Sequence, residues 1–184
     1  MRVIAGIAKG RPLKGPRGRN LRPTSDLVRG AMFDMLRAME ADLARVLDLY
    51  AGTGALGIEA LSRGAAWCDF VEKDEHSCRL IRENLSRTDL AEKGAVFCWP
   101  AERALTRLKS RYSLILADPP YDDDGAESVL AKLAGSSLTG AETIILVEHS
   151  QRRSPAPALG PYGLLTSRRH GDTCISLYRA GGNT

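Results

Sequence analysis

The sequence predicts an α/β protein with a doubly wound, mostly parallel sheet of seven strands and a small N-terminal hairpin or arm. Short apolar runs alternate with helical patterns between residues 46 and 148. This alternation is typical of parallel strands whose crossover helices cover both faces of a sheet. A glycine-rich turn joins the first run to its helix, and the fourth run stops at an acid and two prolines. The 184 residues suffice for one sizeable core, so we expect one main domain.

Positive charge is concentrated at the start of the chain. Residues 1 to 29 hold eight basic residues against Asp26 alone, although the whole chain has a formal net charge of only +4. We therefore predict a basic N-terminal arm, residues 1–24, followed by the main domain, residues 25–184. A basic segment on a mildly acidic body favours a polyanionic partner. A solvated arm without a binding role is the alternative.

The composition, with 43% hydrophobic and 26% charged residues, is that of an ordinary globular protein. No apolar run reaches the roughly 20 residues that a membrane helix needs, and the first residues do not lead into a signal-peptide core. We therefore expect a cytoplasmic monomer without a membrane partner. The four cysteines show no Cys-x-x-Cys spacing and only three histidines accompany them. Reduced thiols are expected, and a bound metal is not.

Residues 1–23 carry short apolar pieces among glycines, prolines and basic residues, which favours a small hairpin or an extended arm. Thr24 or Ser25 can then cap a helix. That helix has one apolar face, and Arg29 is expected on or near its other side, where a phosphate could reach it. The apolar face consists of Val28, Met32, Met35, Leu36 and Met39.

Five apolar runs are predicted to form the parallel strands, because each is short and bounded by turn formers. The runs are residues 46–50, 68–72, 95–99, 114–117 and 143–148. Residues 150–161 contain three prolines and are predicted to form a loop. Beyond it, residues 164–168 and 173–179 have the pattern of a closing hairpin.

The glycine turn, residues 51–57, matches the pattern Gly52-x-Gly54-x-x-Gly57 of dinucleotide-binding sites. Its glycines permit close approach of a ligand, and Glu72 lies where an acid grips ribose hydroxyls. The pattern does not choose between NAD and S-adenosylmethionine. Asp48 favours the methyl donor, because its negative charge suits the donor's cationic amino-acid end. The candidate cofactor-binding residues here are Asp48, Tyr50, Ala51, Gly52, Thr53, Gly54, Gly57 and Glu72.

The fourth strand ends in Asp118-Pro119-Pro120-Tyr121, which we call the ledge. Its prolines offer no backbone N–H to a sheet and hold the chain extended. The Asp118 side chain and the Pro119 carbonyl could accept both hydrogens of an exocyclic base amine and make its nitrogen more nucleophilic. Tyr121 could stack on the flipped base. We therefore assign catalytic roles to Asp118, Pro119, Pro120 and Tyr121; a surface turn with an incidental ring is the alternative.

Stretches that match one protein family occur along nearly the whole chain. The sequence resembles the RsmD family of bacterial ribosomal RNA methyltransferases. The narrowest signals are the Arg-Pro-Thr segment that starts at Arg22 and the long run from Ala51 to Gly64. The matching stretches are residues 2–6, 9–11, 22–26, 28–29, 47–64, 118–121 and 171–172, with Phe33.

The resemblance implies a Rossmann-like class I methyltransferase fold. It also implies transfer of a methyl group from S-adenosylmethionine to the 2-amino group of guanine-966 in 16S rRNA. The RNA would be met within a 30S subunit or an assembly intermediate, with help from the N-terminal arm. On this basis the RNA-binding candidates are Lys9, Arg11, Arg22, Thr24 and Arg29.

The sequence departs from the expected family pattern after the third predicted strand. Relatives of this kind often carry a polar side chain there that meets the donor's adenine, whereas this chain has Pro100. Proline has neither side-chain polarity nor an N–H. Adenine recognition is therefore expected from the Ala101 backbone or from Glu102.

Three other functions remain open at this stage. A small NAD-dependent oxidoreductase would use the same glycine turn. An adenine-N6 methyltransferase on DNA or RNA would share the ledge, and only the arm and the family resemblance disfavour it. A nucleic-acid binder that has lost catalysis would keep the arm and fail to bind the donor.

Overall fold

Eight strands and five α-helices make up the part of the chain that the computed structural model describes, residues 1–15, 26–120 and 125–181. The strands are β1 (Arg45–Leu49), β2 (Trp67–Glu72), β3 (Gly94–Cys98), β4 (Leu114–Ala117), β5 (Ile144–Ser150), β6 (Ala158–Leu159), β7 (Tyr162–His170) and β8 (Thr173–Ala180). The helices are α1 (Asp26–Ala38), α2 (Ala55–Ser62), α3 (Glu75–Arg87), α4 (Ala101–Arg107) and α5 (Ala126–Ala134), with a short 3-10 turn at Ala91–Lys93.

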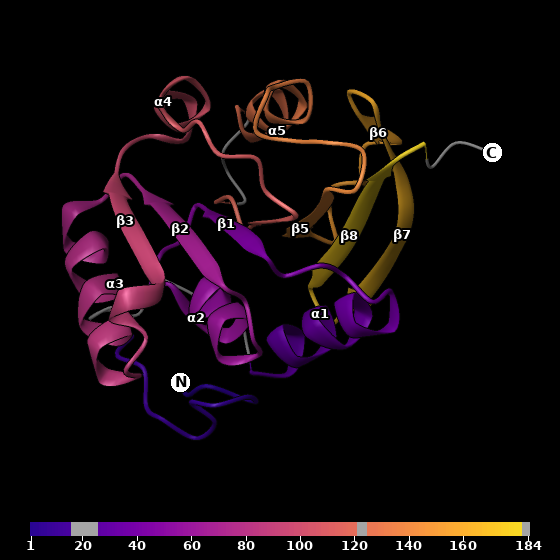
Figure 1. Cartoon of the computed structure of the whole chain (residues 1–184). Helices are drawn as coiled ribbons and strands as arrows, with labels where there is room; N and C mark the ends of the chain where they lie inside the picture. Colours follow the sequence, from indigo (N-terminus) through magenta and orange to yellow (C-terminus); the bar gives the residue numbers. More distant parts are fainter. Residues whose placement is uncertain (16–25, 121–124, 182–184) are drawn as a thin grey trace.

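The sheet has the strand order β3-β2-β1-β4-β5-β8-β7-β6, and β1 to β5 run parallel. The chain passes outward from β1 to β3 and then returns to β4 on the other side of β1, so the winding reverses between β1 and β4. Helices α1, α2 and α3 cover one face, and α4 and α5 cover the other (Figure 1). The predicted doubly wound arrangement is confirmed, and open sheets of this kind bind ligands at the carboxyl ends of the strands beside such a reversal.

The sheet has eight strands where the sequence predicts seven. The additional strand is β6, which lies inside the predicted loop at residues 150–161 and pairs antiparallel with β7. It has only two residues because Pro157 precedes it closely and Pro161 follows it, and neither can donate to a ladder. The predicted closing hairpin is confirmed as β7 and β8, with β8 antiparallel to both β5 and β7.

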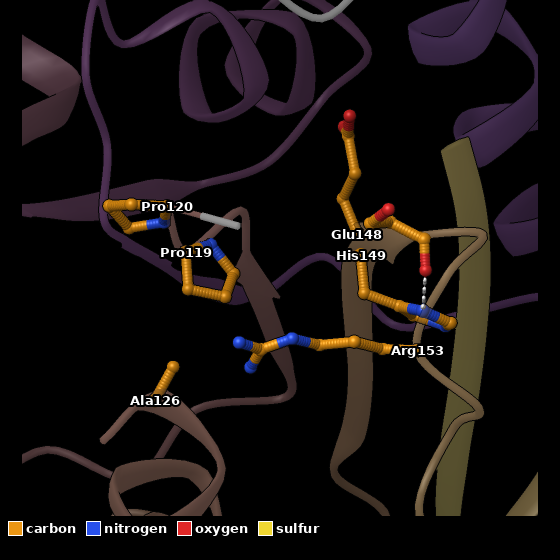
Figure 2. Close-up of a pocket in the computed structure, with 7 residues that line it drawn as sticks. Pro119, Pro120, Ala126, Glu148, His149 and Arg153 are labelled. Carbon is orange, nitrogen blue, oxygen red and sulfur yellow. Dashed lines mark hydrogen bonds between the residues drawn. The ribbon is translucent and has the colours of Figure 1, made fainter. Parts of the chain in front are cut away.

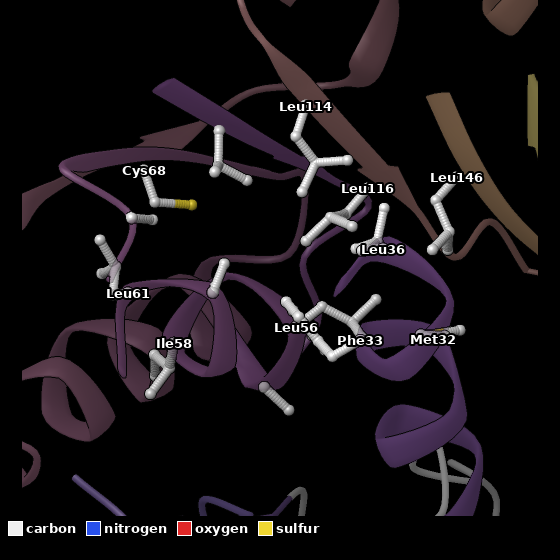
Figure 3. Close-up of a cluster of buried hydrophobic side chains, with 14 of the residues drawn as sticks. Met32, Phe33, Leu36, Leu56, Ile58, Leu61, Cys68, Leu114, Leu116 and Leu146 are labelled. Carbon is white, nitrogen blue, oxygen red and sulfur yellow. The ribbon is translucent and has the colours of Figure 1, made fainter. Parts of the chain in front are cut away.

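Helices α1 and α2 pack side by side on the sheet (Figure 3). Helix α1 buries its predicted apolar face, with Met39 half-buried just beyond the helix end. Every residue of α2 is buried, which fixes the glycine turn that precedes it. The side chains labelled in this cluster are Met32, Phe33, Leu36, Leu56, Ile58, Leu61, Cys68, Leu114, Leu116 and Leu146.

The first residues of the chain form the predicted small hairpin. An antiparallel bridge joins Arg2 to Pro12. Val3 and Leu13 are buried in the same core cluster as α1 and α2. The hairpin therefore shares a core with the main domain and is held against it.

Arg29 differs from its predicted placement. Its side chain is fully buried instead of accessible, and Nη2 donates to Arg2 O at 2.5 Å and to Asp26 Oδ1 at 2.9 Å. Its Nε also lies 3.7 Å from a carboxylate oxygen of Glu59, which is itself fully buried. The expectation that Arg29 is open to a phosphate is therefore wrong, because the buried acid draws it inward.

Some predicted positions lie outside the described residues. These are Arg22 and Thr24 of the arm and Tyr121 of the ledge. Their roles stay predictions, as does the division of the chain at residue 24.

Within the described ranges, none of the helices combines the length and the apolar character that crossing a bilayer requires. All four cysteines are free thiols: Cys68 and Cys78 are buried, and Cys98 and Cys174 are half-buried.

Candidate active site

Acidic residues gather where β1, β2 and β4 end. The register pairs Leu49 of β1 with Val71 of β2 and with Ala117 of β4. Glu72 follows Val71, and Asp118 follows Ala117. Both acids therefore lie at the level of Tyr50, the residue after Leu49. The carboxyl edge at the winding reversal therefore carries the predicted ribose-binding acid and the predicted catalytic acid on either side of β1.

The glycine turn depends on left-handed backbone. Tyr50, Gly52 and Gly54 have φ angles of 64°, 54° and 76°. Two of these three residues are glycines, which adopt such angles without steric cost. A hydrogen bond of 2.7 Å from Gly54 N to Ala51 O closes the turn before α2 begins. Thr53 lies within this turn. The predicted cofactor-binding residues 50–54 thus form one continuous turn at the end of β1.

Glu72 is bound to the glycine turn. Its Oε2 accepts from Gly52 N at 2.9 Å, and its Oε1 accepts from Asp74 N at 2.8 Å. A carboxylate oxygen has two lone pairs, so each oxygen can accept a further hydrogen bond. The side chain is therefore held in place while it keeps acceptor capacity for ribose hydroxyls.

Asp48 is a buried acid with unused acceptor capacity. Its Oδ2 accepts from Gly57 N at 2.8 Å, whereas Oδ1 has no hydrogen-bond partner among the described residues. Burial raises the pKa of Asp48 well above its usual value, and the negative charges of Asp118 and Glu72 add to the rise, while the Gly57 N–H opposes it. A cationic ligand group at Oδ1 would offset these effects and favour the carboxylate.

Gly57 allows α2 to lie close to β2. A Cβ atom at this position would lie 2.3 Å from Phe70 Cε1 and 2.7 Å from Cys68 Sγ, and both side chains are fully buried. The third glycine of the predicted pattern is thus needed for helix–sheet packing.

We expect Gly57→Ala to lower the free energy of unfolding by about 1–3 kcal/mol, the usual cost of overpacking a core. Gly30→Ala is the matched control, since Gly30 also lies in a helix and a Cβ there meets nothing within 4 Å. The control should be neutral or stabilising by up to about 1 kcal/mol, because alanine is the better helix former. Urea unfolding of both variants measures the difference, and equal stability would contradict the packing role of Gly57.

Two described residues of the ledge, Pro119 and Pro120, border a small pocket that is open to solvent (Figure 2). The opposite wall comes from the end of β5. There, two hydrogen bonds hold the His149 ring: Nε2 lies 2.8 Å from Ser176 Oγ, and Nδ1 lies 3.1 Å from Ser150 O. The residues that line the pocket are Pro119, Pro120, Ala126, Glu148, His149, Ser150 and Arg153.

Sequence reasoning missed the β5 side of this pocket. Glu148 was assigned only to the fifth strand, and His149 and Arg153 were given no role. A signal was available, because a buried apolar strand that ends in Glu-His-Ser places polar groups at the carboxyl edge.

The candidates for adenine recognition lie at the start of α4. Ala101 is buried and Glu102 is exposed, and Pro100 precedes the helix without a side-chain cap. Cys98, at the end of β3, pairs with Glu72, so this segment starts beside the predicted ribose-binding acid. The assignment of Ala101 and Glu102 stays a prediction.

The basic hairpin is partly neutralised by α3 and the turn after it. Arg11 forms an ion pair with Asp89, and Lys14 forms one with Glu83. Lys9 is exposed. These pairs lie at the surface, where their contribution to stability is small and an RNA phosphate could compete for the cations.

Asn84 ties the arm to the glycine turn. Its Oδ1 accepts from Lys14 N at 2.8 Å, and its Nδ2 donates to Lys14 O and to Thr53 O at 3.0 Å each. Asn84 is fully buried. The arm therefore reaches the candidate cofactor site through one side chain that sequence reasoning did not single out.

Comparisons with known proteins identify the family of the chain. The model of the family described as "Conserved hypothetical protein 95" matches residues 1–179. Ribosomal RNA small subunit methyltransferase D of Escherichia coli (strain K12) is 31% identical over 179 residues, which cover 97% of this chain and 89% of that protein. A Bacillus subtilis (strain 168) protein, provisionally named an rRNA methyltransferase, is 34% identical over 185 residues and covers 99% of this chain and 100% of that protein.

The fold comparison extends over the whole molecule. A solved Escherichia coli protein, described provisionally as a methyltransferase, superimposes with a TM-score of 0.84 at 32% identity and covers 100% of this chain and 99% of that chain. The chain belongs to the family described as "Conserved hypothetical protein 95", the RsmD family that its motifs resemble.

Proposed function

We propose that this protein transfers the methyl group of S-adenosylmethionine to the 2-amino group of a guanine in 16S rRNA. The observation that carries the proposal is the position of Asp118 and the two prolines. They lie one strand away from the glycine turn, at the same level of the same sheet edge. Membership of a family with named ribosomal RNA methyltransferases supports the substrate class.

The residues of the cofactor site fit this donor. Asp48 Oδ1 is a buried acceptor without a partner among the described residues, which suits a cationic amino group. Glu72 keeps acceptor capacity for the ribose hydroxyls, and Gly52 leaves open space where a Cβ would be. When bound, S-adenosylmethionine supplies an activated methyl group on a positively charged sulfur.

The protein contributes mainly positioning. The Asp118 carboxylate and the Pro119 carbonyl would accept the two amine hydrogens and turn the nitrogen lone pair toward the crevice. Formation of the new N–C bond, as the C–S bond breaks, leaves one surplus proton on the nitrogen. Asp118 is the acid nearest to that nitrogen in this arrangement and would accept the proton.

The RNA would be held by the arm. Lys9 and Arg11 are the described candidates, and Arg22 and Thr24 belong to the same proposal. Arg29 is left out, because its side chain is buried. A ribosomal substrate would place the protein in the cytoplasm, and we propose that it acts as a monomer on a 30S particle or an assembly intermediate.

Transfer of labelled methyl groups tests the proposal. The substrates are 16S rRNA, free and within 30S particles from cells that lack the endogenous enzyme, and the modified nucleotide is mapped. We expect N2-methylguanine at one position. Label on DNA adenine would overturn the RNA assignment, and the absence of label from both would overturn the proposed reaction.

A further inference from the structure

Glu148 stands beside the catalytic acid. Ala117 of β4 pairs with Val147 of β5, so Asp118 and Glu148 follow paired residues at the same level of two neighbouring strands. Side chains alternate between the faces of a sheet, so residues that follow paired positions are directed to the same face. Glu148 is only 4% exposed and lines the pocket with Pro119 and Pro120. A buried carboxylate therefore adjoins the place where the target amine is held.

A guanine held by its 2-amino group needs one more acceptor. Its Watson–Crick edge carries three hydrogen atoms to donate, two on the amine and one on N1, beside the O6 acceptor. The ledge accounts for the amine hydrogens, which leaves N1–H. A buried donor without an acceptor is costly, and an ionised carboxylate is an acceptor only. Glu148 has the chemistry that N1–H requires.

A basic side chain reaches the same pocket. Figure 2 shows Arg153 extending across the pocket toward Pro119 and Ala126. A guanidinium donates and never accepts, so it suits the O6 atom of guanine and not the amine that adenine carries there. In Figure 2 the Glu148 carboxylate and the Arg153 guanidinium point in different directions, so the reading of N1–H rests on Glu148 alone. Adenine would instead present the N1 lone pair to a carboxylate.

We propose that Glu148 is the residue that selects guanine, by accepting the hydrogen bond of N1–H while Asp118 and Pro119 hold the amine. This inference rests on the proposed function and adds the group that reads the base. It would also make the site reject adenine, although the ledge alone would accept an adenine amine.

A base analogue changes the groups at N1 and at position 6 while it keeps the target amine, and a variant of Glu148 then separates the N1 contact. In 2,6-diaminopurine the 2-amino group is kept, but N1 carries no hydrogen and O6 is replaced by an amine. Single-turnover methyl transfer is measured on ribosomal RNA reconstituted into 30S particles with either guanine or this analogue at the target position. The wild-type protein should prefer guanine by about 10- to 100-fold, the effect of losing a hydrogen bond to a charged group.

Glu148→Gln reverses part of this preference. The amide can donate to the unprotonated N1 of the analogue, so the preference for guanine should narrow at least about tenfold. Glu142→Gln is the matched control: Glu142 is 84% exposed in its side chain and lies just before the other end of β5. It should keep the wild-type preference. Thermal melting and donor binding confirm that each variant is folded.

Two results would overturn the role of Glu148. One is equal rates of the wild-type protein on guanine and the analogue, which needs no variant. The other is a Glu148→Gln protein that loses activity equally on both substrates, as a structural role would predict. If the wild-type protein transfers no methyl group to guanine, the proposed function itself fails and this inference falls with it.

Discussion

Replacement of Asp118 by alanine is expected to slow methyl transfer by about 10²- to 10⁴-fold, the range that a positioned acid–base group contributes. The carboxylate would hold the target amine and receive its proton, and no other described acid occupies its position on the ledge. Donor binding should change little, because the proposed donor contacts come from Asp48 and Glu72. Single-turnover kinetics with labelled donor measures the rate, and calorimetry with S-adenosylmethionine measures the affinity.

Two further variants separate the possible roles of this acid. Asp118→Asn keeps one acceptor oxygen and cannot take up a proton, so an intermediate rate would assign part of the effect to positioning. Asp34→Ala, an exposed acid on α1 paired with Arg37, should behave like the wild-type protein. An Asp118→Ala protein with more than about a tenth of the wild-type rate would refute the catalytic role.

Local patterns predicted the central part of the site. The glycine turn, the strand before it and the ledge can each be recognised from a few residues. Glycines allow the backbone angles of the turn, and the prolines of the ledge lack the N–H groups that would extend the strand. Asp118 lies beside the glycine turn because β4 is the neighbour of β1. The alternation of strands and helices limits the strand orders that are possible. Hence the sequence was enough to predict that Asp48, Glu72 and Asp118 meet at one edge.

Contacts between distant segments were not predictable in the same way. Strand β6 has two residues and exists because β7 offers it a partner, so no periodicity marks it. Glu148 was recognisable as a strand residue, but its role depends on the register of β5 against β4. A helical pattern placed Arg29 on an accessible side, although Phe33, one turn later on the same side, is buried.

The burial of Arg29 leads to the second large effect that we expect. Glu59 of α2 is fully buried and accepts hydrogen bonds from Ile4 N at 2.8 Å and from Ala5 N at 3.0 Å. It also accepts from Arg63 Nε at 2.7 Å and lies 3.7 Å from Arg29 Nε. One carboxylate thus joins the hairpin, α1 and α2, which are far apart in the sequence.

Glu59→Ala should therefore lower the free energy of unfolding by about 3–5 kcal/mol, the cost of removing one partner of a buried ion pair. The fully buried guanidinium of Arg29 would lose its buried carboxylate partner and keep only the half-exposed Asp26, and two backbone N–H groups of the hairpin would lose their acceptor. Since a domain has only about 5–15 kcal/mol of stability in total, this loss is a large share of it. Denaturant unfolding of the full chain measures the effect.

Glu75→Ala is the control for this prediction, because Glu75 is an exposed helix acid with an i,i+4 partner, Arg79. Its removal should change stability by no more than about 0.5 kcal/mol. The double variant Glu59→Gln with Arg29→Met removes both charges together and should recover part of the loss, because a buried pair replaced by neutral groups no longer leaves an isolated charge. If Glu59→Ala matched the Glu75 control, the carboxylate would not be what holds the hairpin to α1 and α2, and the packing of Val3 and Leu13 with the hydrogen bonds of Ser62 and Asn84 would hold it instead.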